Sequence, residues 1–238
     1  MNNGKTAAVV LAAGQGKRMQ AGQPKQFMLL GGRPVLYYAL AAFEKSEVDE
    51  IILVTGADEI DYCRAEIVEH YGFRKVTQII PGGKERYHSV ACGLKALKQS
   101  KCDIVLIHDG ARPFVTEEMI RQMIAETKVY HACVTGTLVK DTIKIADEEG
   151  FCVTTPDRKR VWAVQTPQSF AYPLVLDAYE KLLEQENKLL QAGVSITDDA
   201  MVVERMTSQK VKLVEGSYRN IKLTTPEDMI VCESYLRE

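Results

Sequence analysis

The sequence predicts an α/β protein: a Rossmann-like, mostly parallel sheet with helices on both faces, plus a protruding β-hairpin arm. Short apolar, β-branched runs alternate with longer amphipathic stretches through the first half of the chain, as in proteins whose strands are joined by crossover helices. A basic loop with glycines follows the first run, where parallel sheets place their ligands. At 238 residues, the chain has the length of one large domain, so we expect a single domain over residues 1–238.

The first predicted strand is the apolar run at residues 7–11 (AAVVL), because such continuous runs fit a strand buried on both faces. A brief extended piece at 26–30 then turns into an amphipathic helix that ends near Phe43. The second strand is predicted at 50–55 (EIILVT), followed by a polar helix over 58–71.

The third and fourth strands are predicted at 76–80 and 103–107, with an amphipathic helix between them and a further helix capped by Thr116. The carboxyl ends of parallel strands meet at one edge of a sheet, so the loops that follow them are expected to form one crevice. These loops are residues 12–25, 81–89 and 108–113.

The pattern changes at about Cys133. Residues 137–145 and 150–155 flank the turn sequence ADEE and predict a hairpin arm, over about 136–160, that lies outside the main core. An isolated hairpin is marginally stable in water, so it either packs on a second copy of the chain or is an ordinary edge hairpin. After it, we expect extended structure at 161–170, helices from 173 to 190 and from 197, strands at 211–214 and 220–223, and a closing helix that begins at Thr225-Pro226-Glu227.

The loop after the first strand holds Gly14 and Gly16, then Lys17, Arg18 and Lys25, and no acidic residue precedes Glu44. Glycines let backbone N–H groups face a ligand, and the cations favour an anion, so phosphate binding is preferred over a solvated basic turn. The loop lacks the glycine and hydroxyl positions of a Walker A loop. It also lacks the third small residue and the ribose-binding acid of a dinucleotide fingerprint, which disfavours an NAD-binding oxidoreductase.

Two further residues lie at positions suited to chemistry. Asp109 follows the fourth strand, where a carboxylate can meet a ribose hydroxyl, a bound Mg²⁺ or a cation. Lys222 lies between apolar residues, and on composition alone it is a solvent-facing lysine, just as Arg158 belongs to a solvated charge cluster. The histidines have no metal-ligand spacing, and no nucleophile motif is present.

Composition excludes several classes of protein. The net charge of −2 gives no sign of bulk nucleic-acid binding, and the six cysteines have no paired spacing that would indicate a disulfide framework. No apolar run reaches membrane-spanning length and no signal-peptide pattern is visible, so we expect a soluble, cytoplasmic protein.

Seven motifs together resemble one enzyme family, and the resemblance extends from about Ala8 to the last helix. The motifs are LAAGQGKRM…PKQF, PGGKERYHSV, HDGARPF, KDTIK, DRKRVWAVQTPQ, ITDDA and VEGSYRNIKLTTPED, and the family is the 2-C-methyl-D-erythritol 4-phosphate cytidylyltransferases. The resemblance implies that the acceptor phosphate attacks the α-phosphorus of CTP and releases pyrophosphate, in a step of non-mevalonate isoprenoid biosynthesis. Such a reaction needs reactants held in line and charge neutralised, with Mg²⁺ or another divalent cation bridging the phosphates; its protein ligands are not identified.

The resemblance also implies roles for individual residues. Arg18 and Lys25 would grip the triphosphate, Lys222 would hold the attacking phosphate, and Asp109 would lie near the ribose and the acceptor. In this family the arm reaches the neighbouring subunit, so Thr142, Arg158 and Arg112 would complete the partner's site in a homodimer. The cytosine and the rest of the substrates would contact Ala12, Ala13, Gly14, Gly16, Gly83, Ser89 and Thr166.

Two alternatives remain open. A ribitol-5-phosphate cytidylyltransferase shares the first and third motifs, although Asp157-Arg158, Trp162 and KDTIK resemble the methylerythritol enzyme more closely. A module that binds CTP without turnover is the second, and Arg18, Lys25 and Lys222 argue against it.

Overall fold

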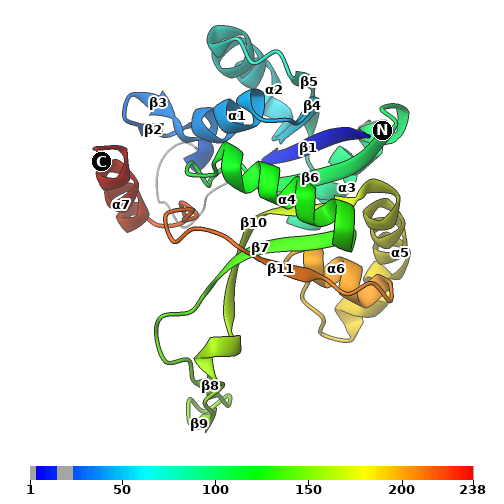
Figure 1. Ribbon diagram of the computed structural model, residues 1–238, viewed down its shortest axis with the longest axis vertical. Coiled ribbons are helices and arrows are strands. Elements are labelled where there is room, and N and C mark those ends of the chain that lie inside the picture. Colours follow the sequence, from blue (N-terminus) through cyan, green and yellow to red (C-terminus); the bar gives the residue numbers. More distant parts are fainter. Residues whose placement is uncertain (1–3, 15–23, 238) are drawn as a thin grey trace.

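The computed structural model describes residues 4–14 and 24–237, and these form one large mixed sheet (Figure 1). Its strands are β1 (Lys5–Ala12), β4 (Glu50–Thr55), β5 (Val76–Pro81), β6 (Cys102–Asp109), β7 (Ala132–Leu138), β10 (Trp162–Ala171) and β11 (Lys212–Glu215). Their order is β11-β7-β10-β6-β1-β4-β5, and only β10 runs antiparallel to its neighbours. The predicted mostly parallel α/β sheet is confirmed.

Helices cover both faces of the sheet because its central strands are apolar on both sides. Ala8 and Val10 of β1 pack in one hydrophobic cluster, and Ala7 and Val9 in another, since successive strand residues point to opposite faces. The first face is covered by α1 (Val35–Lys45) and α4 (Glu117–Tyr130). The second is covered by α3 (Arg86–Ala96), α5 (Tyr172–Gln191) and α6 (Asp199–Met206). The predicted cap of α4 is confirmed, because the Thr116 side chain accepts from the Met119 N–H at 3.2 Å.

Two predicted elements differ in detail. The helix expected over 58–71 is divided into η3 (Ala57–Glu59), α2 (Ile60–Tyr62) and a π-helical segment, η4 (Cys63–Glu69). The piece expected to be extended at 26–30 begins as a 3₁₀ turn, η2 (Lys25–Phe27), and only β2 (Leu29–Leu30) pairs, with β3 (Arg33–Pro34).

The strand expected at 220–223 is wrong. This segment precedes α7 (Pro226–Arg237) and is not part of a strand; its backbone bonds instead to the loop after β6. The Arg112 guanidinium donates to the Asn220 carbonyl at 2.7 Å, and the Leu223 N–H donates to the Ala111 carbonyl at 2.8 Å. These bonds fix Lys222 beside the end of β6.

The arm begins later than the sequence suggests. Residues 132–137 are buried in β7, which lies between β11 and β10 in the main sheet, whereas the prediction placed the change of pattern at about Cys133. The misplacement arises because β7 is rich in small and hydroxyl residues (ACVTGTL), which the sheet buries all the same. Only β8 (Ile145–Ala146) and β9 (Cys152–Thr154) form the separate antiparallel hairpin, which projects from the body of the molecule (Figure 1).

All six cysteines are free thiols, as the absence of paired spacing predicts. Burial raises the pKa of Cys63, Cys133 and Cys232 to about 11, so these thiols are unreactive and pack as small apolar side chains. Within residues 4–14 and 24–237, no helix combines the length and the apolar character needed to cross a membrane.

Candidate active site

A cavity of about 690 Å³ opens at the carboxyl ends of β1 and β6, where the three loops were expected to meet. Of the residues predicted to bind substrate, those that line it are Ala12, Ala13, Gly14, Lys25, Gly83, Ser89, Asp109 and Lys222. Gly16 and Arg18 lie outside the described residues. The expected convergence of the loops on one crevice is therefore confirmed for the described part of the chain.

The loop after β5 approaches β1 closely enough to require glycine. A Cβ atom on Gly82 would lie 2.6 Å from the Ser89 Oγ atom and 2.7 Å from the Ala13 Cβ atom. The Ser89 hydroxyl accepts a hydrogen bond from the Gly83 N–H at 3.1 Å and lies 3.3 Å from the Glu85 carbonyl, to which it donates. Ser89 thus holds the loop that forms one wall of the cavity.

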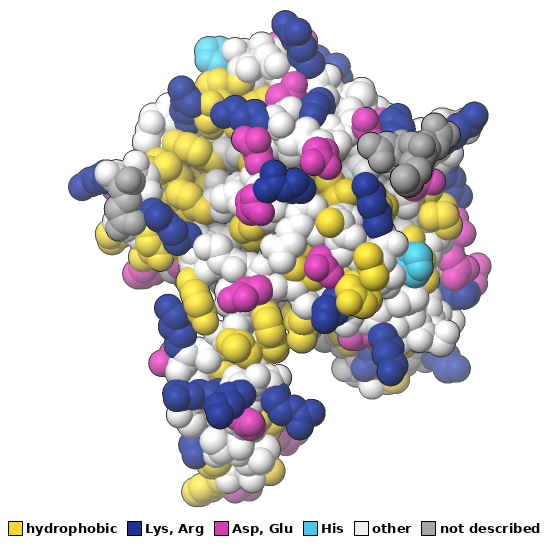
Figure 2. Space-filling model, in the orientation of Figure 1, with side chains coloured by type: hydrophobic (Ala, Val, Ile, Leu, Met, Phe, Trp, Pro, Cys, Tyr) yellow, Lys and Arg dark blue, Asp and Glu magenta, His cyan; other side chains and the backbone are white. Residues whose placement is uncertain are grey.

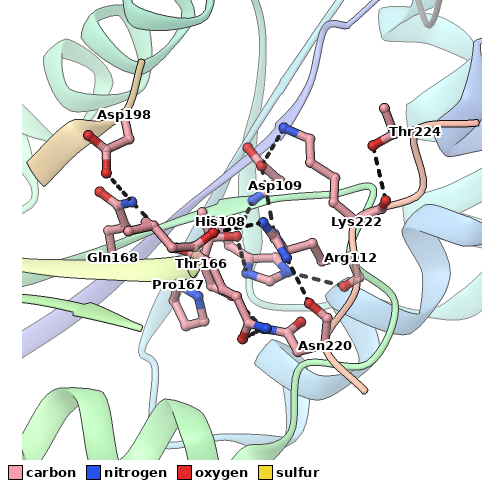
Figure 3. A network of polar contacts seen from close by, with 12 residues as sticks. His108, Asp109, Arg112, Thr166, Pro167, Gln168, Asp198, Asn220, Lys222 and Thr224 are labelled. Carbon is pink, nitrogen blue, oxygen red and sulfur yellow. Dashed lines mark hydrogen bonds and ion pairs between the residues drawn. The ribbon is translucent and has the colours of Figure 1, made fainter. Parts of the chain in front are cut away.

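Asp109 is the centre of the charge arrangement. Its Oδ2 atom lies 2.7 Å from the Lys222 Nζ atom and 3.9 Å from the Arg112 Nε atom, and its Oδ1 atom lies 3.2 Å from the Arg86 Nε atom. Burial alone would raise the pKa of Asp109, but the charges of Arg86, Lys222 and Arg112 outweigh it and hold that pKa well below its usual range. Asp109 is therefore ionised, and the partly exposed Lys222 side chain is directed toward it (Figure 3).

A buried hydrogen-bond chain fixes the backbone of Asp109. The Asp109 N–H donates to the Thr166 Oγ1 atom at 3.0 Å, and Oγ1 lies 3.1 Å from the Nδ1 atom of His108 (Figure 3). The Nε2 atom of His108 lies 3.2 Å from the Arg112 carbonyl, which can only accept, so Nε2 carries the proton and Nδ1 accepts from Thr166. Burial lowers the pKa of His108 to about 4, and this neutral tautomer satisfies both of its ring nitrogens.

A second cavity, of about 550 Å³, adjoins the first. Arg86, Asp109 and Lys222 line both cavities, while Arg112 and Thr166 line only the second. The Asp109–Lys222 ion pair therefore lies on the boundary between two spaces, one formed by the loops after β1 and β5 and the other by β10 and α6.

Arg112 is not where the resemblance placed it. It is 9% exposed, and its guanidinium bonds to the Asn220 carbonyl of its own chain, so it belongs to its own chain's site and not to a partner's. Its Nε atom is buried without a hydrogen-bond partner in the described structure and points toward the Asp109 side of the second cavity. The sequence could not reveal this, because it depends on how the 217–223 segment folds back.

Thr142 and Arg158 lie on the arm and are exposed. The Arg158 Nη1 atom donates to the Lys140 carbonyl at 3.2 Å, and neither residue lines the two cavities. Figure 2 shows Lys and Arg side chains gathered on the arm; the exposed cations there are Lys140, Lys144, Arg158, Lys159 and Arg160. Within one chain, the arm does not contribute to the cavity.

Several site residues escaped the sequence reasoning. Arg86, at the start of α3, joins Asp109 to Asp199, and Gln26 donates to the Ala12 carbonyl at 2.5 Å, which ties the end of β1 to η2. Asn220 is fully buried, and its side chain donates to the Thr166 carbonyl at 2.9 Å. Their positions within the quoted motifs PGGKERYHSV, PKQF, ITDDA and VEGSYRNIKLTTPED were the only available signal.

The described residues contain no group of three or more His, Cys, Asp or Glu side chains that could hold a metal ion. Asp109 does not fit a protein-held metal site either, because each of its carboxylate oxygens already meets a cation. Ser89 has no histidine partner, since the His88 Nδ1 atom accepts from the Glu85 N–H. The site is thus built to bind and orient anions, which together with the parallel α/β fold is the arrangement of a nucleotidyltransferase.

Comparison with known proteins specifies the class further. The family model "IspD: 2-C-methyl-D-erythritol 4-phosphate cytidylyltransferase" matches residues 6–238, and this chain belongs to that family. It is 50% identical over 234 residues to the protein of that name from Lachnoclostridium phytofermentans, covering 98% of this chain and 97% of the relative. It is 46% identical over 233 residues to the one from Caldanaerobacter subterraneus, covering 98% and 99%.

Comparison with solved structures identifies the same family. The crystal structure of 4-diphosphocytidyl-2C-methyl-D-erythritol synthase from Anaerococcus prevotii superposes with a TM-score of 0.85 at 36% identity, covering 99% of this chain and 97% of that one. The 2-C-methyl-D-erythritol 4-phosphate cytidylyltransferase of Thermus thermophilus gives a TM-score of 0.74 at 29% identity, covering 97% and 98%. The resemblance found from the sequence motifs is confirmed.

Proposed function

We propose that this chain transfers the cytidylyl group of CTP to 2-C-methyl-D-erythritol 4-phosphate in isoprenoid biosynthesis. Besides the family, the observation that carries this proposal is the Asp109–Lys222 pair on the boundary between two adjoining cavities. A lysine there faces both spaces, so it can hold an acceptor phosphate on one side of a nucleotide phosphate.

In this reaction an oxygen of the acceptor phosphate attacks the α-phosphorus of CTP. The bond from the α-phosphorus to the oxygen that bridges it to the β-phosphate breaks, and pyrophosphate leaves with that electron pair. A phosphate monoester is already anionic, so no side chain has to remove a proton from it. The protein's contribution is in-line positioning and charge stabilisation.

In our assignment, CTP occupies the first cavity, with its base against Ala12, Ala13 and the loop held by Ser89. Lys25, and Arg18 and Gly16 outside the described residues, would bind the triphosphate. The acceptor enters from the second cavity, where Lys222 would hold its phosphate and Arg112 and Thr166 lie within reach. Mg²⁺ would arrive as the Mg–CTP complex, since the described carboxylates do not fit a protein-held ion.

The arm, about residues 136–160 of a single domain, would complete the acceptor site of a partner subunit in a cytoplasmic homodimer. Arg158 and Thr142 support this assignment, because both are exposed and far from their own cavities in the fold. Mixing Lys25→Ala and Arg158→Ala subunits tests it, at acceptor concentrations well below KM, where both variants are impaired. Restored activity is expected, and no recovery despite confirmed subunit exchange would show that the sites are not shared.

The function itself is tested by pyrophosphate release with Mg²⁺ and CTP, comparing 2-C-methyl-D-erythritol 4-phosphate with ribitol 5-phosphate. Selective turnover of the first acceptor is expected. Turnover of the second alone would mean that the acceptor side is built for ribitol 5-phosphate. Binding of CTP without turnover of either would favour a nucleotide-sensing module.

A further inference from the structure

A fully buried carboxylate lies behind the site and contacts neither cavity in the described structure. Asp199, the first residue of α6, is 0% exposed and accepts hydrogen bonds from two nitrogens of Arg86, at 2.7 and 2.8 Å. The Tyr179 hydroxyl on α5 donates to its Oδ1 atom at 2.5 Å. A buried carboxylate needs such partners, because no water replaces them.

Arg86 connects Asp199 to Asp109 in the candidate active site. Its Nη1 and Nη2 atoms bind Asp199, and its Nε atom lies 3.2 Å from the Asp109 Oδ1 atom. All three guanidinium nitrogens therefore face one of two carboxylates, which fixes both the position and the plane of the group. Arg86 also lines both cavities, so its position matters to whatever enters them.

In the proposed function, Lys222 changes partner. Its Nζ atom is 2.7 Å from the Asp109 Oδ2 atom, and it would turn from there to the acceptor phosphate. Asp109 would then be a buried carboxylate that has lost a cation, which is costly unless another cation stays in place. Arg86, at 3.2 Å from the other carboxylate oxygen, lies closer to Asp109 than Arg112 at 3.9 Å and is placed to be that cation.

Arg86 could not serve if it were free to move. A mobile guanidinium beside a triphosphate would bind two phosphate oxygens at once and abandon Asp109. Asp199 prevents this movement by its paired bonds, and Tyr179 in turn orients Asp199.

We propose that Asp199 is a positioning residue of the transfer reaction. By fixing Arg86, it keeps Asp109 charge-compensated while Lys222 moves from Asp109 to the acceptor phosphate. The inference rests on the proposed function for the role of Lys222, but not for the restraint on Arg86.

The central test is Asp199→Asn, which keeps the shape of the side chain and removes its charge. We expect kcat to fall at least about tenfold while the KM for CTP falls, because the released Arg86 gains access to the triphosphate. An unchanged kcat would overturn the proposal.

A double-mutant cycle with Arg86→Gln separates positioning from a general loss of structure. If Asp199 acts through Arg86, Asp199→Asn adds almost nothing to the kcat loss caused by Arg86→Gln. Losses that multiply would show that Asp199 acts independently of Arg86 and would refute the inference.

Tyr179→Phe provides a milder variant in case Asp199→Asn folds poorly, and the chain offers a matched control. Tyr87 on α3 donates to Glu186 on α5 at 2.6 Å, so it too joins two helices through a Tyr–carboxylate bond. Glu186, however, does not contact Arg86 or Asp109 through any hydrogen bond found in the described structure. We expect Tyr179→Phe to lower kcat by about two- to fivefold and Tyr87→Phe to leave it unchanged. Equal losses in both would reduce the effect to helix packing and contradict the proposal.

Calorimetric titration with Mg–CTP distinguishes failure of this inference from failure of the proposed function. Tighter binding of Mg–CTP by Asp199→Asn than by the wild type, by about threefold or more, is expected even if the wild type turns over neither acceptor. Weaker or equal binding would show that Asp199 does not restrain Arg86. A wild type without turnover would refute only the proposed function.

Discussion

The Asp109 region and the hairpin arm are built on opposite principles. Asp109, His108 and Asp199 are buried, and protein groups meet their charges or polar atoms from every side. On the arm, Thr142 and Arg158 are exposed, and the Arg158 guanidinium donates to the Lys140 carbonyl of the arm itself.

The difference is that one chain completes the charge cluster around Asp109 by itself, whereas the exposed cations of the arm have few partners within the chain. A buried ion-pair cluster is pre-organised, because the cost of orienting its dipoles is met during folding and not during the reaction. An exposed cation on a projecting hairpin contributes little to the stability of its own chain. Its role depends on a second molecule that binds at the arm.

The largest effect is expected in the first cavity, beside the buried charge cluster. Lys25 lines the first cavity, and Lys25→Ala should lower kcat by about 10²- to 10³-fold, as for removal of a group that stabilises developing charge. Steady-state pyrophosphate release measures it. Turnover near that of the wild type would remove Lys25 from the catalytic residues.

The second prediction concerns His108 and the pH dependence of stability. Its pKa is about 4 when folded and about 6.5 when unfolded, so between these values the unfolded chain binds a proton that the folded chain does not. Stability from this group is therefore complete above about pH 6.5 and is lost as the pH falls toward 4, by up to about 3 kcal/mol. Urea unfolding across this range should show the slope in the wild type, and His108→Gln should flatten it.

The third prediction tests the exposed hairpin arm. Arg158→Ala should raise the KM for the acceptor about tenfold while leaving CTP affinity nearly unchanged, since Arg158 lies away from the nucleotide cavity. Calorimetry with CTP and kinetics with varied acceptor measure the two effects separately. Equal weakening of both substrates would contradict an acceptor-side role.

The smallest effect is expected at the tip of the arm, where a large apolar side chain is exposed. Phe151 is 69% exposed, so Phe151→Ser should change the free energy of unfolding of a dilute sample by less than about 0.5 kcal/mol. Sedimentation at higher concentration should nevertheless show weaker self-association if the tip contacts a partner. Phe170→Ser provides the counterpart: this side chain is fully buried in β10, and we expect a loss of several kcal/mol.

The order of the elements and the place of the cavity could be predicted because they depend on patterns within short segments of the sequence. Residues 50–55 were predicted with the bounds that β4 has, because a run buried on both faces leaves a continuous apolar signal. The loops after β1, β5 and β6 could be expected to meet, because the carboxyl ends of parallel strands lie at one edge. The motifs sufficed to indicate the family.

Only the tertiary structure decided which charges meet. Arg86 and Asp199 are 113 residues apart, and Asp109 and Thr166 are 57 apart, so no local pattern connects them. The same holds for β7, whose small and hydroxyl residues are buried by the strands on either side, and for Arg112, which its own 217–223 segment encloses. Hydrophobic periodicity records how much of a segment is buried, whereas an ion pair depends on two side chains meeting at one point, and that is fixed only when the whole chain has folded.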